Sequence, residues 1–158
     1  MRAGSGSTWD PRPLLVGECN PYDLLRADPR LDLYPLPPRS AGARLARILG
    51  LSPHEYLRRF ARVNLCRGEW SALLARDQAR ELVWSAQEHG GRPFILLGAR
   101  VSAAFRCAFQ PFGTAAVTAD LFSTVEVFML PHPSGRSRLW NEEGSQERAR
   151  LLLARFLA

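Results

Sequence analysis

Four short strand candidates, separated by segments with helical signals, constrain the fold of this chain more than any other feature. They are residues 14–16 with Gly17 after them, 62–66, 93–98 and 125–130. No Asn-Gly or similar hairpin signal joins any two of these runs, so successive strands are not expected to pair through a tight turn. Strands that alternate with helices form a parallel sheet with helices on both faces. The sequence therefore predicts an α/β fold, a three-layer α/β/α arrangement around a central four-stranded parallel sheet.

Helices are predicted between and after these strands, over residues 40–49, 52–60, 70–89, 99–109 and 142–157. Ser40 and Ser52 have the character of N-caps, because a serine hydroxyl can accept from the free N–H groups of a first helical turn. Residues 23–40 are too rich in proline to be helical, so we expect an ordered irregular segment over the functional face of the sheet. Residues 110–124 are given no assignment.

The length and composition are those of one globular domain. The chain has 158 residues, of which 46% are hydrophobic and 23% charged, as in soluble proteins. We expect residues 1–13 to form a flexible lead-in and residues 14–158 a single domain. No apolar run approaches the roughly 20 residues of a membrane span. The start of the chain has no apolar signal-peptide region, which favours a cytoplasmic protein without membrane contact.

The charge and the cysteines bear on partners and cofactors. The formal net charge is +6, and every basic residue is an arginine. An excess of positive charge favours a nucleic-acid partner, although a general bias toward arginine explains the absence of lysine equally well. Cys19, Cys66 and Cys107 contain no C-x-x-C pair, so neither a disulfide framework nor a four-thiolate cluster is expected. The sequence therefore predicts no metal and no cofactor.

The segment after the fourth strand is the strongest site candidate. His132 stands between two prolines, and Gly135 permits a sharp turn behind it. The residues around this turn that can contact phosphate are Ser134, Arg136, Ser137 and Arg138. Polar residues also follow the first strand, from Glu18 to Tyr22, and the second, at Asn64. The carboxyl ends of parallel strands lie at one edge of a sheet, so these side chains should converge on one pocket.

Three of these stretches resemble motifs of the uracil-DNA glycosylase superfamily. They are Leu15-Val16-Gly17-Glu18-Cys19-Asn20-Pro21-Tyr22, Arg62-Val63-Asn64-Leu65-Cys66-Arg67 and His132-Pro133-Ser134. Residues 40–45 and 94–98 also match the superfamily pattern, as scaffold, so the resemblance covers residues 14 to 141. It implies the superfamily's fold and a DNA glycosylase, which flips a base out of DNA and hydrolyses its bond to deoxyribose.

The resemblance implies catalytic roles for Asn20, His132 and Glu18. His132 would donate a hydrogen bond to the base oxygen that becomes anionic, and Asn20 would position the attacking water. Many members have aspartate at the Asn20 position, and an amide cannot take up a proton; thymine-mismatch members also use asparagine. Glu18 is a second candidate, because one extra residue after Gly17 leaves the alignment open by one position. Asn20 is otherwise a turn residue before proline.

The resemblance also implies residues that hold the base and the DNA. Tyr22, Tyr34, Asn64 and Cys19 form the base-binding set, in which Asn64 would bond to the base's pairing edge and Tyr34 would stack on it. The structural alternatives are that Asn64 bonds to the backbone at the end of its strand and that Tyr34 is an ordinary packing residue. The DNA-binding set is Ser40, Ser134, Gly135, Arg136, Ser137, Arg138 and Leu139, with Arg138 or Leu139 as the wedge in the vacated stack.

We therefore expect a monomeric glycosylase acting on uracil or a related damaged or modified base in single- or double-stranded DNA. Deaminated purines and modified pyrimidines stay open as substrates. A non-hydrolytic protein that binds DNA or modified bases is the alternative, favoured by the missing aspartate. An unrelated α/β hydrolase is disfavoured because the chain has no G-x-S-x-G turn.

Overall fold

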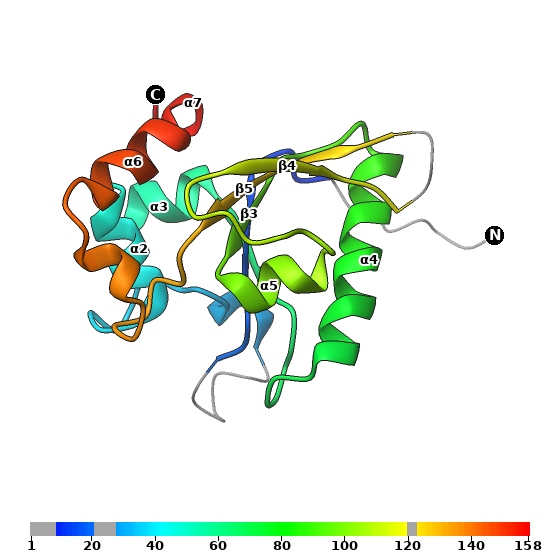
Figure 1. The fold of residues 1–158 in the computed structure, drawn as a ribbon, viewed down its shortest axis with the longest axis horizontal. Helices are drawn as coiled ribbons and strands as arrows, with labels where there is room; N and C mark the ends of the chain where they lie inside the picture. The colour runs from blue at the N-terminus through cyan, green and yellow to red at the C-terminus, as the bar shows by residue number, and fades with distance from the viewer. Residues whose placement is uncertain (1–8, 21–27, 120–122) are drawn as a thin grey trace.

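The computed structural model describes residues 9–20, 28–119 and 123–158, which form an α/β domain (Figure 1). Its strands are β1 (Leu14–Gly17), β2 (Ala61–Asn64), β3 (Phe94–Leu97), β4 (Thr114–Val117) and β5 (Val125–Leu130). Its helices are α2 (Ala41–Ile48), α3 (Pro53–Arg59), α4 (Ala72–Glu88), α5 (Ala99–Ala104), α6 (Ser145–Leu152) and α7 (Ala154–Leu157). Short 3-10 helices, η1 (Pro29–Leu31) and η2 (Arg138–Asn141), lie in two of the loops. Within the described ranges, none of the helices combines the length and apolarity that a bilayer crossing needs.

The five strands form one mixed sheet in the order β2-β1-β3-β5-β4. β1 pairs in parallel with β2 and β3, and β3 pairs in parallel with β5. β4 is antiparallel to β5, with Thr114 opposite Phe128 and Val117 opposite Val125. The α/β class is confirmed, but the prediction of a sheet of four strands, all parallel, was wrong. β4 was missed because it is a short edge strand, Thr-Ala-Ala-Val, in which only the valine is buried, and alanine carries little strand signal.

Two predicted helices differ from the observed ones for reasons visible in the backbone. The helix expected over 99–109 ends at Ala104, since Arg106 adopts a positive φ of 59°. The helix expected over 142–157 begins only at Ser145 and is divided into α6 and α7 at Leu153, whose φ is −100° and ψ 12°; Gly144, with φ 78°, precedes α6 in a left-handed conformation. A left-handed residue interrupts the helical hydrogen-bond ladder, so α5 cannot continue through Arg106 and α6 cannot extend back through Gly144.

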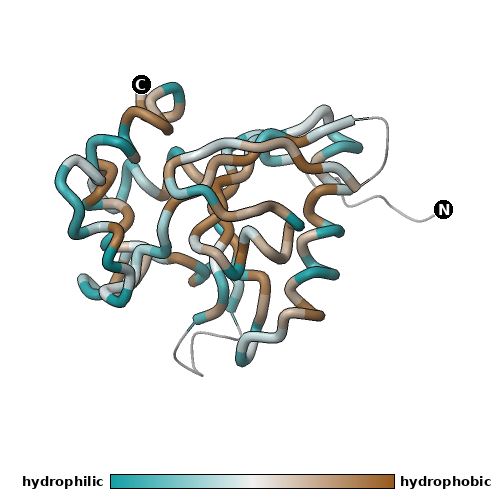
Figure 2. Tube along the Cα trace, viewed as in Figure 1, coloured by the Kyte–Doolittle hydropathy of each residue, from teal (hydrophilic) through white to brown (hydrophobic). Residues whose placement is uncertain are grey.

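Helices cover both faces of the sheet (Figure 1). One hydrophobic cluster lies under α4 and α5 and includes Phe94 and Leu96, and the other lies under α2, α3 and α6 and includes Ile95 and Leu97. Successive residues of β3 thus enter opposite cores, which explains why this strand is apolar at every position. Figure 2 shows hydrophobic segments along the central strands and hydrophilic ones on the outer helical turns.

The proline-rich segment lies against the start of α2. A Cβ atom at Gly42 would lie 2.1 Å from the carbonyl oxygen of Leu33 and 2.4 Å from that of Tyr34. The Tyr56 hydroxyl donates to the Leu33 carbonyl at 2.9 Å. Ser40 caps α2 by accepting from Ala43 N–H at 3.1 Å and donates to the Tyr34 carbonyl at 3.0 Å. Residues 28–40 are therefore ordered although only η1 within them is helical.

The close approach at Gly42 predicts that Gly42→Ala destabilises the protein, the reverse of the usual effect of alanine in a helix. Alanine normally favours a helix interior over glycine by up to about 1 kcal/mol, but here its methyl group would collide with backbone oxygens. We expect the free energy of unfolding to fall by about 1 to 3 kcal/mol, measured by urea denaturation. Gly68→Ala, where a Cβ would meet no atom within 4 Å, is the control and should be near neutral. Equal effects of the two substitutions would contradict the contact.

Candidate functional site

The carboxyl ends of the parallel strands and residues 31–44 enclose a cavity of about 700 Å³. Of the residues singled out from sequence, those that line it are Glu18, Cys19, Asn20, Tyr34, Ser40, Asn64, His132, Ser134, Gly135, Arg136 and Ser137. Arg138 and Leu139 lie in η2 and do not line the cavity. Tyr22 lies outside the described residues. The expected convergence of three strand ends on one pocket is therefore observed.

A fully buried carboxylate, Asp32, holds one side of this cavity together. Its side chain is 0% exposed. Its Oδ2 accepts the backbone N–H of Asn64 at 2.8 Å and a hydrogen bond from Arg67 Nη2. Its Oδ1 accepts from Asn20 Nδ2 at 3.4 Å. One side chain of the proline-rich segment thus connects the loops that follow β1 and β2.

These bonds hold two buried asparagines, Asn20 through its side-chain amide and Asn64 through its backbone N–H. Asn20 is 8% exposed and Asn64 4% exposed. Since the amide nitrogen of Asn20 donates to Asp32, the orientation of that amide is fixed. The Asn64 side chain lies directly over Gly17, where a Cβ atom would be only 2.4 Å from Asn64 Oδ1. Glycine at the end of β1 is therefore what allows the Asn64 amide to reach its place.

The His132 ring is fixed in one tautomer. The backbone N–H of Ser134 donates to His132 Nδ1 at 3.1 Å, so the proton of the neutral ring is on Nε2. Trp140 Nε1 donates to the His132 carbonyl at 3.0 Å and anchors the loop. Gly98, with φ 99°, leaves room for the histidine, because a Cβ there would lie 3.1 Å from His132 Cβ.

The surroundings of His132 favour its neutral form. Burial, the largest influence, lowers the pKa of His132 below its ordinary value. The Glu18 carboxylate raises that pKa in part, and the Arg100 guanidinium lowers it. The ring is therefore neutral at pH 7, with one N–H available as a hydrogen-bond donor.

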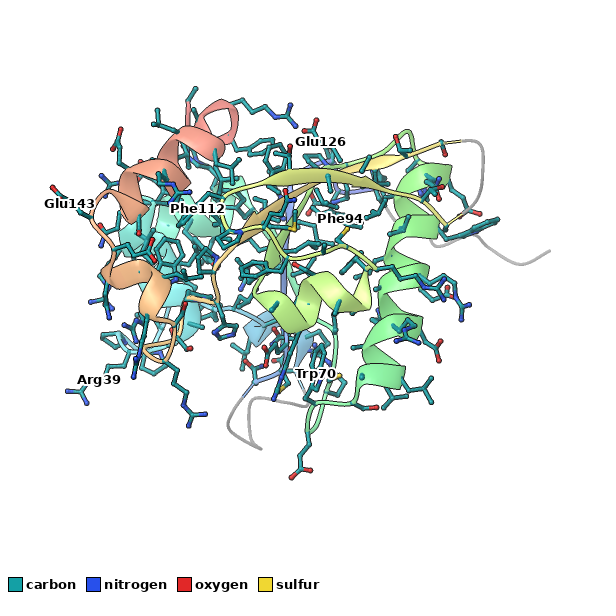
Figure 3. All side chains as sticks on the ribbon, in the orientation of Figure 1. Arg39, Trp70, Phe94, Phe112, Glu126 and Glu143 are labelled. Atoms are coloured by element: carbon teal, nitrogen blue, oxygen red, sulfur yellow. The ribbon has the colours of Figure 1, made fainter. Side chains whose placement is uncertain are left out.

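Glu18 and Tyr34 are each held beside an arginine. Arg100 Nη1 lies 3.7 Å from Glu18 Oε2, and the Arg100 guanidinium is 6.0 Å from the Trp70 ring. Figure 3 shows Trp70 and Arg39 on the lower side of the molecule, the side at which the parallel strands end. The Tyr34 ring has the Arg62 guanidinium 5.4 Å from its centroid. The cavity lining thus supplies a carboxylate and an aromatic ring.

The structure adds residues that the sequence did not single out, above all Asp32, Arg39, Arg44 and Arg100. Asp32 stands between two leucines in a segment without a motif. A charged residue flanked by apolar ones was the only available signal of a buried carboxylate. Arg44 lies in a stretch interpreted as scaffold, and a single arginine on a helix is usually solvated. Neither Asp32 nor Arg44 could be assigned to the cavity before the packing of residues 28–40 was known.

Comparisons with known proteins leave the family open. No protein-family model matches the chain, and no curated protein matches it. Among the described residues, no group of three or more His, Cys, Asp or Glu side chains is arranged to bind a metal ion. What this site does must therefore be argued from the chemistry of its residues.

Replacement of the buried carboxylate tests its structural role. We expect Asp32→Asn to lower the free energy of unfolding by about 1 to 3 kcal/mol, because an amide cannot satisfy all three donors. Asp28→Asn is the matched control, since Asp28 is ion-paired with Arg30 in the same segment but is partly exposed. That change should cost clearly less than Asp32→Asn, because water screens the exposed pair. Equal losses in urea denaturation would contradict the role given to Asp32.

The lowered pKa of His132 predicts a pH dependence of stability. An unfolded histidine takes up a proton near pH 6.5, whereas the folded protein does so only at lower pH. The unfolded state then binds more protons, so stability is lost as the pH falls below about 6.5. His132→Gln should make urea unfolding less sensitive to pH between 7 and 5. His54→Gln, an exposed control on α3, should retain the wild-type dependence; an unchanged dependence in His132→Gln would contradict the assignment.

Proposed function

We propose that the protein is a DNA glycosylase with a uracil-DNA glycosylase-like fold. It hydrolyses the N-glycosidic bond of uracil, or of a related damaged or modified base, flipped out of DNA. The observation that carries the proposal is the convergence of Asn20, Asn64 and His132 in one cavity, two with buried amides and one with a fixed tautomer. Such a set of fixed polar groups matches the needs of base recognition and leaving-group stabilisation.

The base end of the cavity would contain His132 and Asn64. As the glycosidic bond breaks, its electron pair leaves with the base, and negative charge grows on a ring oxygen. A neutral His132 carries its proton on Nε2, so it can donate a hydrogen bond to that oxygen as the negative charge develops. The Asn64 amide can both donate and accept, so it can bond to the pairing edge of a flipped base.

The sugar end would contain Asn20 and Glu18. Water attacks the anomeric carbon: its oxygen forms the new bond to the sugar, one of its protons passes to solvent, and the departing base anion takes up a proton from solvent. The amide of Asn20, oriented by Asp32, can position this water. Glu18 lines the same cavity and supplies the negative charge that offsets the positive sugar. Asn20 would thus position the water and Glu18 would supply the charge, two roles that an aspartate at position 20 could fill alone.

DNA contacts would come from both rims of the cavity. Ser134, Ser137 and Arg136 lie on the histidine loop, and Ser40 and Arg39 lie at the start of α2. Guanidinium groups and hydroxyls are the usual phosphate contacts in such interfaces. The net charge of +6 supports the same partner.

A second candidate is a non-hydrolytic protein that binds modified bases in DNA. The hydrogen bond from Asn20 to Asp32 favours it, because this contact gives Asn20 a structural role that needs no water. The same pocket would then recognise a flipped base without breaking its bond.

A strand-cleavage assay tests the first proposal. Labelled single- and double-stranded oligonucleotides would each carry one uracil, hypoxanthine, xanthine or 5-substituted pyrimidine, and alkali would break abasic sites. We expect the wild type to cleave at one of these bases. His132→Ala should reduce the single-turnover rate by about 10² to 10³-fold, through loss of one donor to the leaving group. His54→Ala, remote on α3, should keep the wild-type rate.

The other outcomes discriminate between the candidates. Tight binding of a modified oligonucleotide without cleavage would favour the base-binding protein. Neither binding nor cleavage of any oligonucleotide would overturn both. Equal rates for wild type and His132→Ala would remove His132 from the chemistry even if cleavage occurs.

A further inference from the structure

Arg44 lies between two cavities. It is half-buried on α2 and lines the 700 Å³ cavity that holds His132. It also lines a second cavity of about 330 Å³, together with Arg47, Trp140, Asn141 and Gln146. The histidine loop passes directly beside it, since a Cβ atom at Gly135 would lie 2.5 Å from Arg44 Nη1. Any ligand that extends from one cavity into the other therefore passes this guanidinium.

The charge of Arg44 is unmatched among the residues that the structure describes. The salt bridges there join six other arginines to Asp or Glu, and no carboxylate lies within 4.0 Å of Arg44. The side-chain hydrogen bonds likewise show no acceptor for its guanidinium. A partly desolvated guanidinium without an anion is poised to bind one, and a phosphate matches its planar donor geometry.

The second cavity has the chemistry of a nucleotide site. Besides the two arginines it presents the side-chain amides of Asn141 and Gln146 and the flank of Trp140. The indole N–H of Trp140 is already bonded to the His132 carbonyl, which holds that ring in place. Amides can bond to a base edge and an aromatic ring can stack on it. The volume lies at the lower end of the range of ligand sites, about 300 to 1,000 Å³.

We propose that Arg44 binds the phosphate joining the extruded nucleotide to its neighbour, and that the second cavity holds this neighbouring nucleotide. The inference rests on the proposed function, since it assumes DNA in the first cavity. A neighbouring nucleotide bound in the second cavity is, like the extruded one, no longer stacked on the other bases of the DNA. The preferred substrate is therefore single-stranded or locally unpaired DNA, recognised as a dinucleotide unit.

Neutral phosphate analogues test the contact. Fluorescein-labelled single-stranded oligonucleotides with one central uracil would carry a methylphosphonate on its 5′ side, on its 3′ side, or four nucleotides away. Dissociation constants would be measured by anisotropy for the wild type, Arg44→Gln and Arg58→Gln. Arg58 is an exposed arginine on α3, remote from both cavities, and is the matched control.

We expect one of the two adjacent methylphosphonates to weaken wild-type binding by about 10- to 100-fold, as for a charged hydrogen bond. Arg44→Gln should show the same loss with the natural oligonucleotide and no further loss with that methylphosphonate, because the two changes remove one interaction. Arg58→Gln should behave as the wild type. An abasic spacer in place of the neighbouring base on the same side should also weaken wild-type binding, and a duplex should bind less tightly than the single strand.

Each remaining outcome is decisive. Additive losses for Arg44→Gln and the methylphosphonate would overturn the phosphate contact, even if bases are released. Coupling without release of any base would support the subsite and overturn the glycosylase. Tighter binding of the duplex than of the single strand by the wild type would overturn the recognition of an unstacked dinucleotide. No binding of any oligonucleotide would overturn both proposals.

Discussion

The buried carboxylate of Asp32 is the interaction on which the cavity depends. It accepts from Asn20, from the backbone of Asn64 and from Arg67, so it ties the proline-rich segment to the ends of two strands. A carboxylate removed from water is costly unless several donors satisfy it. That requirement makes the arrangement specific, since the three donors have to meet at one point. The geometry of this side of the cavity follows from that constraint.

Backbone geometry fixes other polar groups of the cavity, above all His132. The rigid loop after β5 directs Ser134 N–H to His132 Nδ1, and this selects the tautomer with a proton on Nε2. Gly17 and Gly98 leave space for the Asn64 and His132 side chains, respectively. The polar groups are thus oriented before any ligand arrives. Sites preorganised in this way do not need to reorganise their dipoles as charge develops.

The sequence predicted the parts of the fold in which local pattern and tertiary structure agree. The strand at 125–130 was predicted with the observed bounds, because its apolar run is buried on both faces and ends at a proline. The strand at 114–117 was not predicted, since an exposed edge strand of small residues has no such pattern. The convergence of strand ends was predictable from parallel topology alone. Asp32 and Arg44 were not, because their importance arises from contacts between segments distant in sequence.

The central claim is that a flipped base occupies the cavity between Asn64 and His132. The most direct measurement is a crystal structure with a single-stranded oligonucleotide that carries a cleavage-resistant, 2′-fluorinated uridine. The account predicts the uracil within the 700 Å³ cavity, with one ring oxygen at hydrogen-bond distance from His132 Nε2 and its pairing edge on the Asn64 amide. A base that stays stacked in the strand, or that binds elsewhere on the surface, would contradict the account.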